Sequence, residues 1–229
     1  MKALEEKLVN AGMDTSSALI WSSFLTLWSV ILGNAYNQLS SNSNWAAFKK
    51  PISGKPHEND ITVGLYHIIE ELVDKANIDD PIRDFEIKTE APIKDANRRG
   101  SKSRRTDFKV KRRYPASISN HLSVEAKRIL TKSDIKAKYL GAEGLGCFLT
   151  KDSPYTKGPI GMLLAYTFTT TGDFSTELVE AFVKLTNGED KGSSLNKENT
   201  GFEALLKQCR PGTGLKPILI VHSSLIFPD

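Results

Sequence analysis

The longest uncharged stretch of the chain constrains its fold most strongly, because this stretch must be buried in a core or placed in a membrane. No charged residue occurs between Thr15 and Phe48, and residues 18–33 read ALIWSSFLTLWSVILG. A membrane span needs about 20 mainly apolar residues, whereas this run is short and contains four serine or threonine residues. At helical spacing, these polar residues form one stripe opposite an apolar stripe made of Leu19, Ile20, Leu27, Val30 and Ile31. We therefore predict a buried amphipathic helix, with a membrane helix as the alternative.

Length and composition indicate a cytoplasmic globular protein. The 229 residues, 39% of them hydrophobic, suffice for one large domain. The net charge of +4 is a mild basic bias. The two cysteines and four histidines are scattered, which excludes a zinc knuckle and a histidine-rich metal site. The first 17 residues lack the order of charged, apolar and small residues that a signal peptide has.

Hydrophobic periodicity predicts the secondary structure. Helices are expected at residues 2–10, from a cap at 14–16 onward, at 58–75, at 174–187 and at 197–209. Ser133 is expected to cap a helix over 134–150, and 158–170 is expected to be a helix that continues as a strand. Residues 38–56, rich in Ser, Gly and Pro, predict a loop or linker. Strands are expected at residues 83–89, 106–114, 121–130 and 216–223.

This order of elements predicts an α/β fold with a mixed β-sheet flanked by helices. Residues 1–50 are expected to form an N-terminal helical extension, and residues 57–229 the main domain. The strands at 106–114 and 121–130 are separated by a turn that contains Pro115, so they are expected to pair as an antiparallel hairpin.

Three polar residues on this hairpin could perform chemistry. Glu125 and Lys127 are two residues apart, so both point to one face of a strand. Antiparallel pairing could bring Asp107 beside Glu125. Two carboxylates, with the backbone carbonyl of Ala126, are suitable ligands for Mg²⁺ or Mn²⁺. A divalent ion and a nearby lysine are the groups that phosphodiester hydrolysis requires.

The Glu-x-Lys spacing is not specific by itself, since it occurs at residues 5/7, 86/88, 125/127 and 189/191. The first pair lies in a predicted surface helix and the last in a polar loop. Glu86 and Lys88 are the main alternative, because they lie on a predicted strand. Their upstream acids, Asp80 and Asp84, are too close in sequence to occupy a separate paired strand.

The order of these motifs resembles the PD-(D/E)XK nuclease superfamily over roughly residues 57–225. The TDF and VEAK segments carry this resemblance. The segments VEAKRI, YLGAEGLGCFL and YTKGPIGMLLAY are also similar to a pattern in restriction-like proteins of bacterial defence clusters. The matching positions are Glu125, Lys127, Tyr139, Glu143, Gly144, Phe148, Tyr155, Gly161, Met162 and Tyr166. Thr106 stands where the family pattern has proline, and no role is carried onto Gly146 or Cys147.

The resemblance implies a restriction-endonuclease-like fold and a Mg²⁺- or Mn²⁺-dependent endonuclease that acts in anti-phage defence. It implies that Asp107, Glu125 and Lys127 are catalytic. It also implies that an acid on the first core helix joins the metal ligands Asp107, Glu125 and Ala126, and Glu58 is the best candidate for that acid. Glu70 and Glu71, several turns later, are weaker candidates.

A basic segment flanks the proposed site and predicts contacts with nucleic acid phosphates. We expect DNA as the substrate, with RNA as an alternative; a solvated loop is the simpler interpretation of the same charges. The predicted nucleic-acid-binding residues are Arg98, Arg99, Lys102, Arg104, Arg105, Lys109 and Lys111.

Other features favour structural roles or partners. Tyr139, Tyr155, Tyr166 and His222 are interpreted as core residues with satisfied polar atoms. No GxxxxGK[ST] motif occurs, so a homodimer or a complex with a sensor or ATPase protein is expected. The competing function is a catalytically inactive nucleic-acid-binding or structural subunit.

Overall fold

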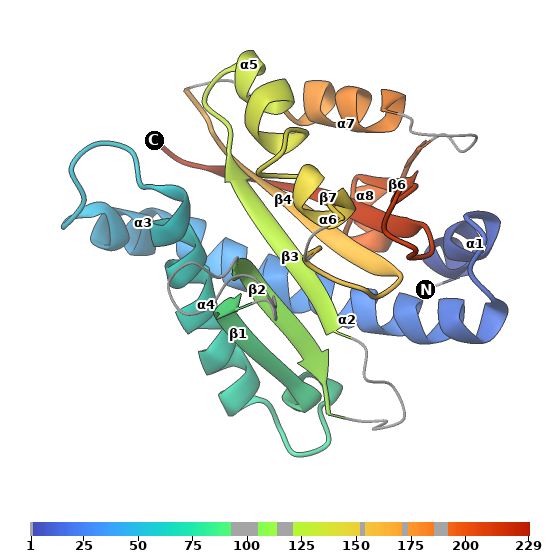
Figure 1. Ribbon diagram of the computed structural model, residues 1–229. Helices are drawn as coiled ribbons and strands as arrows, with labels where there is room; N and C mark the ends of the chain where they lie inside the picture. Colours follow the sequence, from blue (N-terminus) through green and yellow to red (C-terminus); the bar gives the residue numbers. More distant parts are fainter. Residues whose placement is uncertain (1, 93–104, 114–120, 152–153, 171–173, 186–191) are drawn as a thin grey trace.

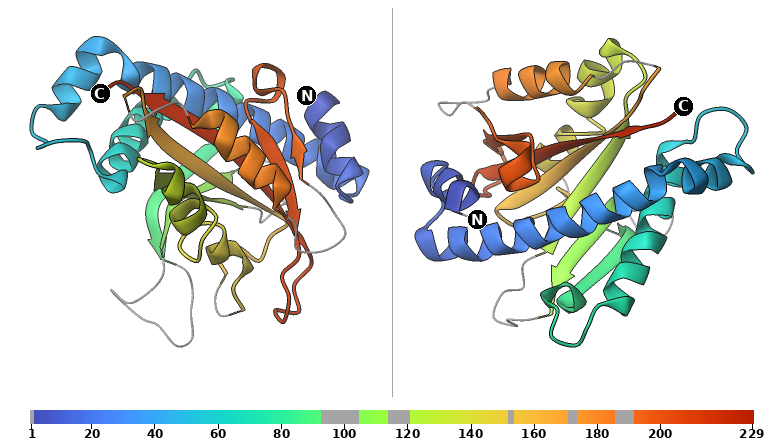
Figure 2. Two further views of the ribbon diagram at one scale, coloured as in Figure 1. Left: turned by 90° about the horizontal axis from the view of Figure 1, so that it is seen from above. Right: turned by 180° about the vertical axis from the view of Figure 1, so that it is seen from behind.

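The computed structural model describes residues 2–92, 105–113, 121–151, 154–170, 174–185 and 192–229. A seven-stranded mixed sheet lies between two layers of helices (Figures 1 and 2). The α/β class predicted from the sequence, with a mixed sheet flanked by helices, is confirmed at this level.

The sheet has the strand order β1-β2-β3-β4-β7-β6-β5. Its central strands β3, β4 and β7 run parallel, and the pairs toward both edges are antiparallel. The predicted antiparallel hairpin is present as β2 and β3. The strands are β1 (Phe85–Pro92), β2 (Arg105–Arg112), β3 (His121–Arg128), β4 (Ile160–Phe168), β5 (Ser193–Ser194), β6 (Ala204–Gln208) and β7 (Ile218–Phe227).

One face of the sheet is covered by the N-terminal helices α1 (Lys2–Asn10), α2 (Thr15–Ser40), α3 (Asn42–Lys49) and α4 (Glu58–Lys75). The view from behind in Figure 2 shows α2 crossing this face diagonally. The apolar side chains of α1, α2 and α4 belong to one core cluster with the sheet. Residues 2–49 are therefore mostly helical, and they share their core with the strands.

The other face is covered by shorter elements: α5 (Lys132–Asp134), the π-helical turn η3 (Ile135–Tyr139), α6 (Gly146–Leu149) and α7 (Ser175–Lys184). Two further short elements are the 3₁₀ turn η1 (Pro81–Asp84) and α8 (Lys197–Thr200). A second core cluster lies between η3, α6, α7 and the strands. Alternating residues of the central strands thus face two different cores, which explains their continuous burial.

Helix α2 packs on the core as predicted, with Ile31 of the predicted apolar stripe buried and Leu27 partly buried, but the other three residues of that stripe lie outside. Leu19, Ile20 and Val30 are exposed, whereas Trp21 and Trp28 are buried against the sheet. The aromatic rings decide the orientation because they remove the most apolar area from water. Among the described residues, α2 is the one helix long and apolar enough to cross a membrane, and 44% of its most apolar window is buried.

The predicted linker at 38–56 was also wrong, because α2 continues to Ser40 and α3 covers Asn42–Lys49. Ser41 lies between the two helices with an extended backbone. Trp45 stacks on Phe227, with ring centroids 4.8 Å apart, and is buried. This long-range contact outweighs the low helix propensity of the serine- and asparagine-rich sequence.

The C-terminal half differs from the predictions at three places. The expected helix at 197–209 ends at Thr200, because Gly201 adopts φ +74° and β6 then pairs with β7. Residues 160–168 form only a strand, β4. The expected helix over 134–150 is split into η3 and α6, and Thr131, not Ser133, precedes the first turn. In the first two of these segments, β6 and β4 are strands because they pair with strands that are distant in the sequence.

Two glycines give a matched test of the packing. A Cβ atom at Gly161 would lie 2.6 Å from the buried Phe148 ring, whereas a Cβ atom at Gly33, inside α2, would meet nothing within 4 Å. We expect Gly161→Ala to lower the free energy of unfolding by about 1–3 kcal/mol and Gly33→Ala to raise it by about 0.5–1 kcal/mol. Chemical denaturation measures both changes. Equal effects of the two variants would contradict this packing.

Candidate active site

The site lies where β2 and β3 separate. The two strands pair from Lys111↔His121 to Phe108↔Val124, and β3 residues beyond Val124 pair only with β4. The backbone N–H of Ala126 is thereby left without a β2 partner, and it donates to Asp107 Oδ2 over 2.7 Å. The carboxylate of Asp107 thus satisfies a buried backbone donor at the opening between the strands.

Lys127 lies between two carboxylates in this opening. Its Nζ is 2.6 Å from Glu125 Oε1 and 2.9 Å from Glu58 Oε1. Glu125 and Lys127 are 4% and 8% exposed. Buried charges are costly unless they are paired. The two contacts of Lys127 therefore permit the side chains of Glu125 and Lys127 to be buried.

Helix α4 contributes Glu58 to the site, whereas the other site residues lie on β2 and β3. Glu58 is the first residue of α4, and its Oε2 accepts a hydrogen bond of 2.9 Å from the N–H of Arg128. Arg128 Nη1 donates to the carbonyl of Pro56 over 2.8 Å. This contribution of Arg128 was not predicted, because neither its residue type nor its spacing signals a contact with a helix 70 residues earlier in the chain.

The crowding of acids shifts their titration strongly. Burial, with the nearby charge of Asp107, raises the pKa of Glu125 to about 9. Burial also raises the pKa of Asp107 to about 6, although the hydrogen bond from Ala126 opposes this. Burial opposes the charge of Lys127, but Glu125 and Glu58 outweigh it and hold the lysine pKa above its usual value. The site therefore carries negative charge only at a large electrostatic cost.

The donor types of this site fit a hard divalent cation. Glu125 Oε2 is buried and has no hydrogen-bond partner among the described residues. Carboxylate oxygens are the ligands that Mg²⁺ and Mn²⁺ prefer. Within the described ranges, however, no three histidine, cysteine, aspartate or glutamate side chains are grouped so as to hold a metal ion. Instead, the ammonium group of Lys127 lies between Glu58 and Glu125.

The basic residues are only partly described. Arg98, Arg99, Lys102 and Arg104 lie outside the described residues. Arg105 lies at the start of β2 and contacts Glu90 over 2.7 Å, and Lys109 and Lys111 follow on the same face of this strand. Burial, together with the charges of Lys109 and Lys111, lowers the pKa of His121 to about 4. These two lysines thus create a positive potential beside the site.

The alternative Glu-x-Lys pair on a strand lies elsewhere. Glu86 and Lys88 form a surface ion pair of 2.8 Å on the edge strand β1. Glu86 is opposite Lys111 and Lys88 is opposite Lys109, so this pair faces basic residues and not a second acid. The structure gives it no carboxylate partner comparable to Asp107 among the contacts of the described residues.

The other polar residues singled out in the sequence lie mostly in the core. Tyr139 hydrogen-bonds with His222 Nδ1, and His222 Nε2 lies 3.0 Å from Glu203. The hydroxyl of Tyr166 is 3.1 Å from Thr62 Oγ1. Tyr139, Tyr166 and His222 are fully buried, in agreement with the predicted structural roles, whereas Tyr155 is only partly buried.

Comparisons with known proteins add no identification. No family model, no curated protein and no solved structure matches this chain.

The shifted pKa of Glu125 predicts how stability depends on pH. Because its folded-state pKa is raised, the protonated acid is favoured in the fold, and stability is lost as pH rises from about 4.5 toward 9. Glu125→Gln removes this loss. In EDTA, we expect the unfolding temperature of the variant minus that of the wild type to grow by about 4 °C per pH unit between pH 5 and 9.

Glu86→Gln is the matched control for this experiment. The hydrogen bond from Lys88 lowers the pKa of the half-buried Glu86, so the Glu86→Gln substitution should give a difference in unfolding temperature that is constant over the same pH range. A constant difference for Glu125→Gln as well would show that Glu125 is not a buried, protonated acid.

Proposed function

We propose that this chain is a metal-dependent endonuclease with a restriction-endonuclease-like fold that hydrolyses phosphodiester bonds in DNA. The observation that carries the proposal is the opening between β2 and β3, where Asp107, Glu125, Lys127 and Glu58 converge. Their residue types are those that phosphodiester hydrolysis needs, and they come from two strands and the start of a helix.

The residues of the chain have separate tasks in this proposal. Lys127 has three N–H donors and can position a water molecule and offset phosphate charge. Asp107, together with Glu125 once a bound cation has displaced the proton that its raised pKa retains, supplies the negative charge that a cation requires. Glu58 and Glu125 hold Lys127 in place and keep it protonated at neutral pH.

Mg²⁺, or Mn²⁺, is the cofactor that this donor set suits. Its ligands would be the side chains of Glu58, Asp107 and Glu125 and the carbonyl of Ala126. When bound, the ion would supply Lewis acidity toward the phosphate and lower the pKa of water. Shared binding by Glu58 and Glu125 requires Lys127 to leave its position between them.

DNA is the proposed substrate because β2 carries basic side chains beside the site. Lys109 and Lys111 share the face of β2 that carries Asp107. RNA is the alternative substrate, because phosphates carry the same charge in both polymers.

A partner is part of the proposal. The exposed side chains of α2 include Leu19, Ile20 and Val30, and α2 carries no charge. This outer face could pair with a second copy, which would allow two sites to cut both strands, or with a sensor or ATPase protein. An effector role in bacterial anti-phage defence, in the cytoplasm, is proposed from the family resemblance alone.

One observation favours the alternative function, a catalytically inactive nucleic-acid-binding or structural subunit. The ammonium of Lys127 occupies the space between Glu58 and Glu125, and the described acids form no ready three-ligand group. In this alternative, the same ion pairs only stabilise the fold, and the lysines of β2 bind nucleic acid without cutting.

Cleavage of plasmid DNA tests the main proposal. We expect wild-type protein to cut with Mg²⁺ or Mn²⁺ and not with EDTA. Glu125→Ala and Lys127→Ala should each reduce the rate by at least about 100-fold, because each removes a group with a role in the transition state. The double variant Glu86→Ala/Lys88→Ala is the matched control and should cut at the wild-type rate with saturating DNA. Metal-dependent cutting that survives Glu125→Ala would contradict this site.

DNA binding in EDTA tests the basic face separately. We expect Lys109→Ala/Lys111→Ala to weaken binding and to reduce the slope of log affinity against log salt by about 2, because about 0.9 counterion is released per phosphate contact. Lys184→Ala, which removes a lysine paired with Glu180 on α7, is the control. An unchanged salt slope for the double variant would show that β2 does not contact phosphates.

A further inference from the structure

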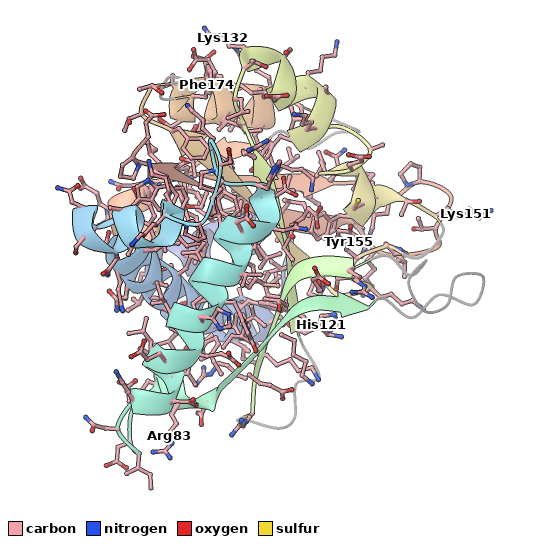
Figure 3. The ribbon with its side chains drawn as sticks, turned by 90° about the vertical axis from the view of Figure 1, so that its left-hand side faces the viewer. Arg83, His121, Lys132, Lys151, Tyr155 and Phe174 are labelled. Atoms are coloured by element: carbon pink, nitrogen blue, oxygen red, sulfur yellow. The ribbon has the colours of Figure 1, made fainter. Side chains whose placement is uncertain are left out.

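We propose that Tyr155 is a further substrate-contacting residue of this site, whose phenolic hydroxyl donates a hydrogen bond to a non-bridging oxygen of the cleaved phosphate. The inference rests on the proposed function. Tyr155 lies on the connection between α6 and β4, and Figure 3 shows it at about the middle height of the molecule, above His121 of β3.

The backbone of Tyr155 is fixed next to the site by β3. Ser123 Oγ donates to the carbonyl of Tyr155 over 2.9 Å, and the N–H of Tyr155 donates to the carbonyl of Cys147 over 3.0 Å. Ser123 and Glu125 are two residues apart on one strand, so their side chains leave the same face about 7 Å from each other. The carbonyl of Tyr155 therefore lies over the face of β3 that carries the side chain of Glu125.

The ring of Tyr155 and its loop are also held in place. The ring packs edge-on against the fully buried Phe148, with centroids 5.6 Å apart. Arg210, itself buried, donates to the carbonyls of Thr156 over 2.9 Å and Gly158 over 3.3 Å. A side chain positioned this firmly needs little reorganisation to contact a substrate.

The hydroxyl is suited to be a donor. Burial, with the negative charges of Glu125 and then of other groups that include Asp107, raises the pKa of Tyr155 well above its usual value. The hydroxyl therefore keeps its proton over the whole working pH range. It also lies within hydrogen-bonding range of the Cys147 thiol, a weak partner that a phosphate oxygen can replace.

The other described tyrosines do not share these features. The hydroxyls of Tyr139 and Tyr166 are fully buried and bonded to His222 and Thr62. The hydroxyl of Tyr36 donates to the carbonyl of Ile226, and Tyr66 is bonded to Glu70 on the surface of α4. Among the described residues, Tyr155 is therefore the one partly buried tyrosine whose pKa responds more to the charge of Glu125 than to any other charge.

Cleavage of stereopure phosphorothioate DNA tests this contact. Sulfur is a poor hydrogen-bond acceptor, so a wild-type enzyme should lose more rate with sulfur at the contacted oxygen than Tyr155→Phe does. We expect Tyr155→Phe to lower kcat by about 10- to 100-fold on normal DNA with little change in KM. The same variant should lose most of the sulfur effect for one diastereomer. Tyr66→Phe, the matched control, should match the wild type on every substrate.

The outcomes separate this inference from the proposed function. If the wild type cuts and Tyr155→Phe cuts equally fast with an unchanged sulfur effect, the contact is wrong and the nuclease stands. If Tyr155→Phe is slow but keeps the full sulfur effect, Tyr155 has only a structural role and the contact is again wrong. If the wild type does not cut any substrate, the proposed function and this inference both fail.

A measurement without catalysis checks the position of Tyr155. The six tyrosines can be labelled with 3-fluorotyrosine and assigned in ¹⁹F NMR spectra by Tyr→Phe variants. Mn²⁺ is paramagnetic and broadens nearby signals, so we expect the Tyr155 signal to broaden at lower Mn²⁺ concentration than those of Tyr36 and Tyr66. Broadening of Tyr36 or Tyr66 before Tyr155 would overturn the placement of Tyr155 beside the site. No broadening of any signal would overturn the Mn²⁺ site of the proposed function, and with it this inference.

Discussion

The position of the Lys127 ammonium between Glu58 and Glu125 is the interaction on which the rest of this site depends. The buried carboxyl group of Glu125 and the buried ammonium of Lys127 would each be costly alone, and Glu58 is half-buried beside them. Together they form contacts of 2.6 and 2.9 Å that join the start of α4 to β3. Removal of one partner leaves an uncompensated charge in the core, so the packing of α4 on the sheet and the geometry of the acids are determined together.

The acids at the opening between β2 and β3 also have a structural role. Separated strands leave backbone donors without partners, and a buried donor without a partner costs about 1–3 kcal/mol. Asp107 accepts the hydrogen bond of the Ala126 N–H, and Glu58 accepts that of the Arg128 N–H. The acids that could bind a cation therefore also stabilise the separated strands. A cation that drew them away would release these donors, which couples any binding at this site to the local backbone.

The sequence predicted the parts of this arrangement that depend on local pattern. The periodicity of residues 58–75 matched α4, and the alternation around Pro115 matched the hairpin that carries Asp107 and Glu125. The contacts that depend on distant residues were missed. Trp45 orders α3 by stacking on Phe227, and β6 is a strand because it pairs with β7. Local propensity is a weak guide where such tertiary contacts decide the structure.

The site collects groups from both layers that flank the sheet. Glu125 and Lys127 share register with Leu163 and Ala165, which face the core beneath α6 and α7. Glu58, however, comes from α4 on the opposite face. A continuous sheet would separate these layers, because its backbone fills the plane between them. The early end of β2–β3 pairing removes that barrier, and Lys127 can reach Glu58 through the opening. Loss of pairing at this one position thus allows acids from two layers, and a tyrosine held by β3, to meet around one point.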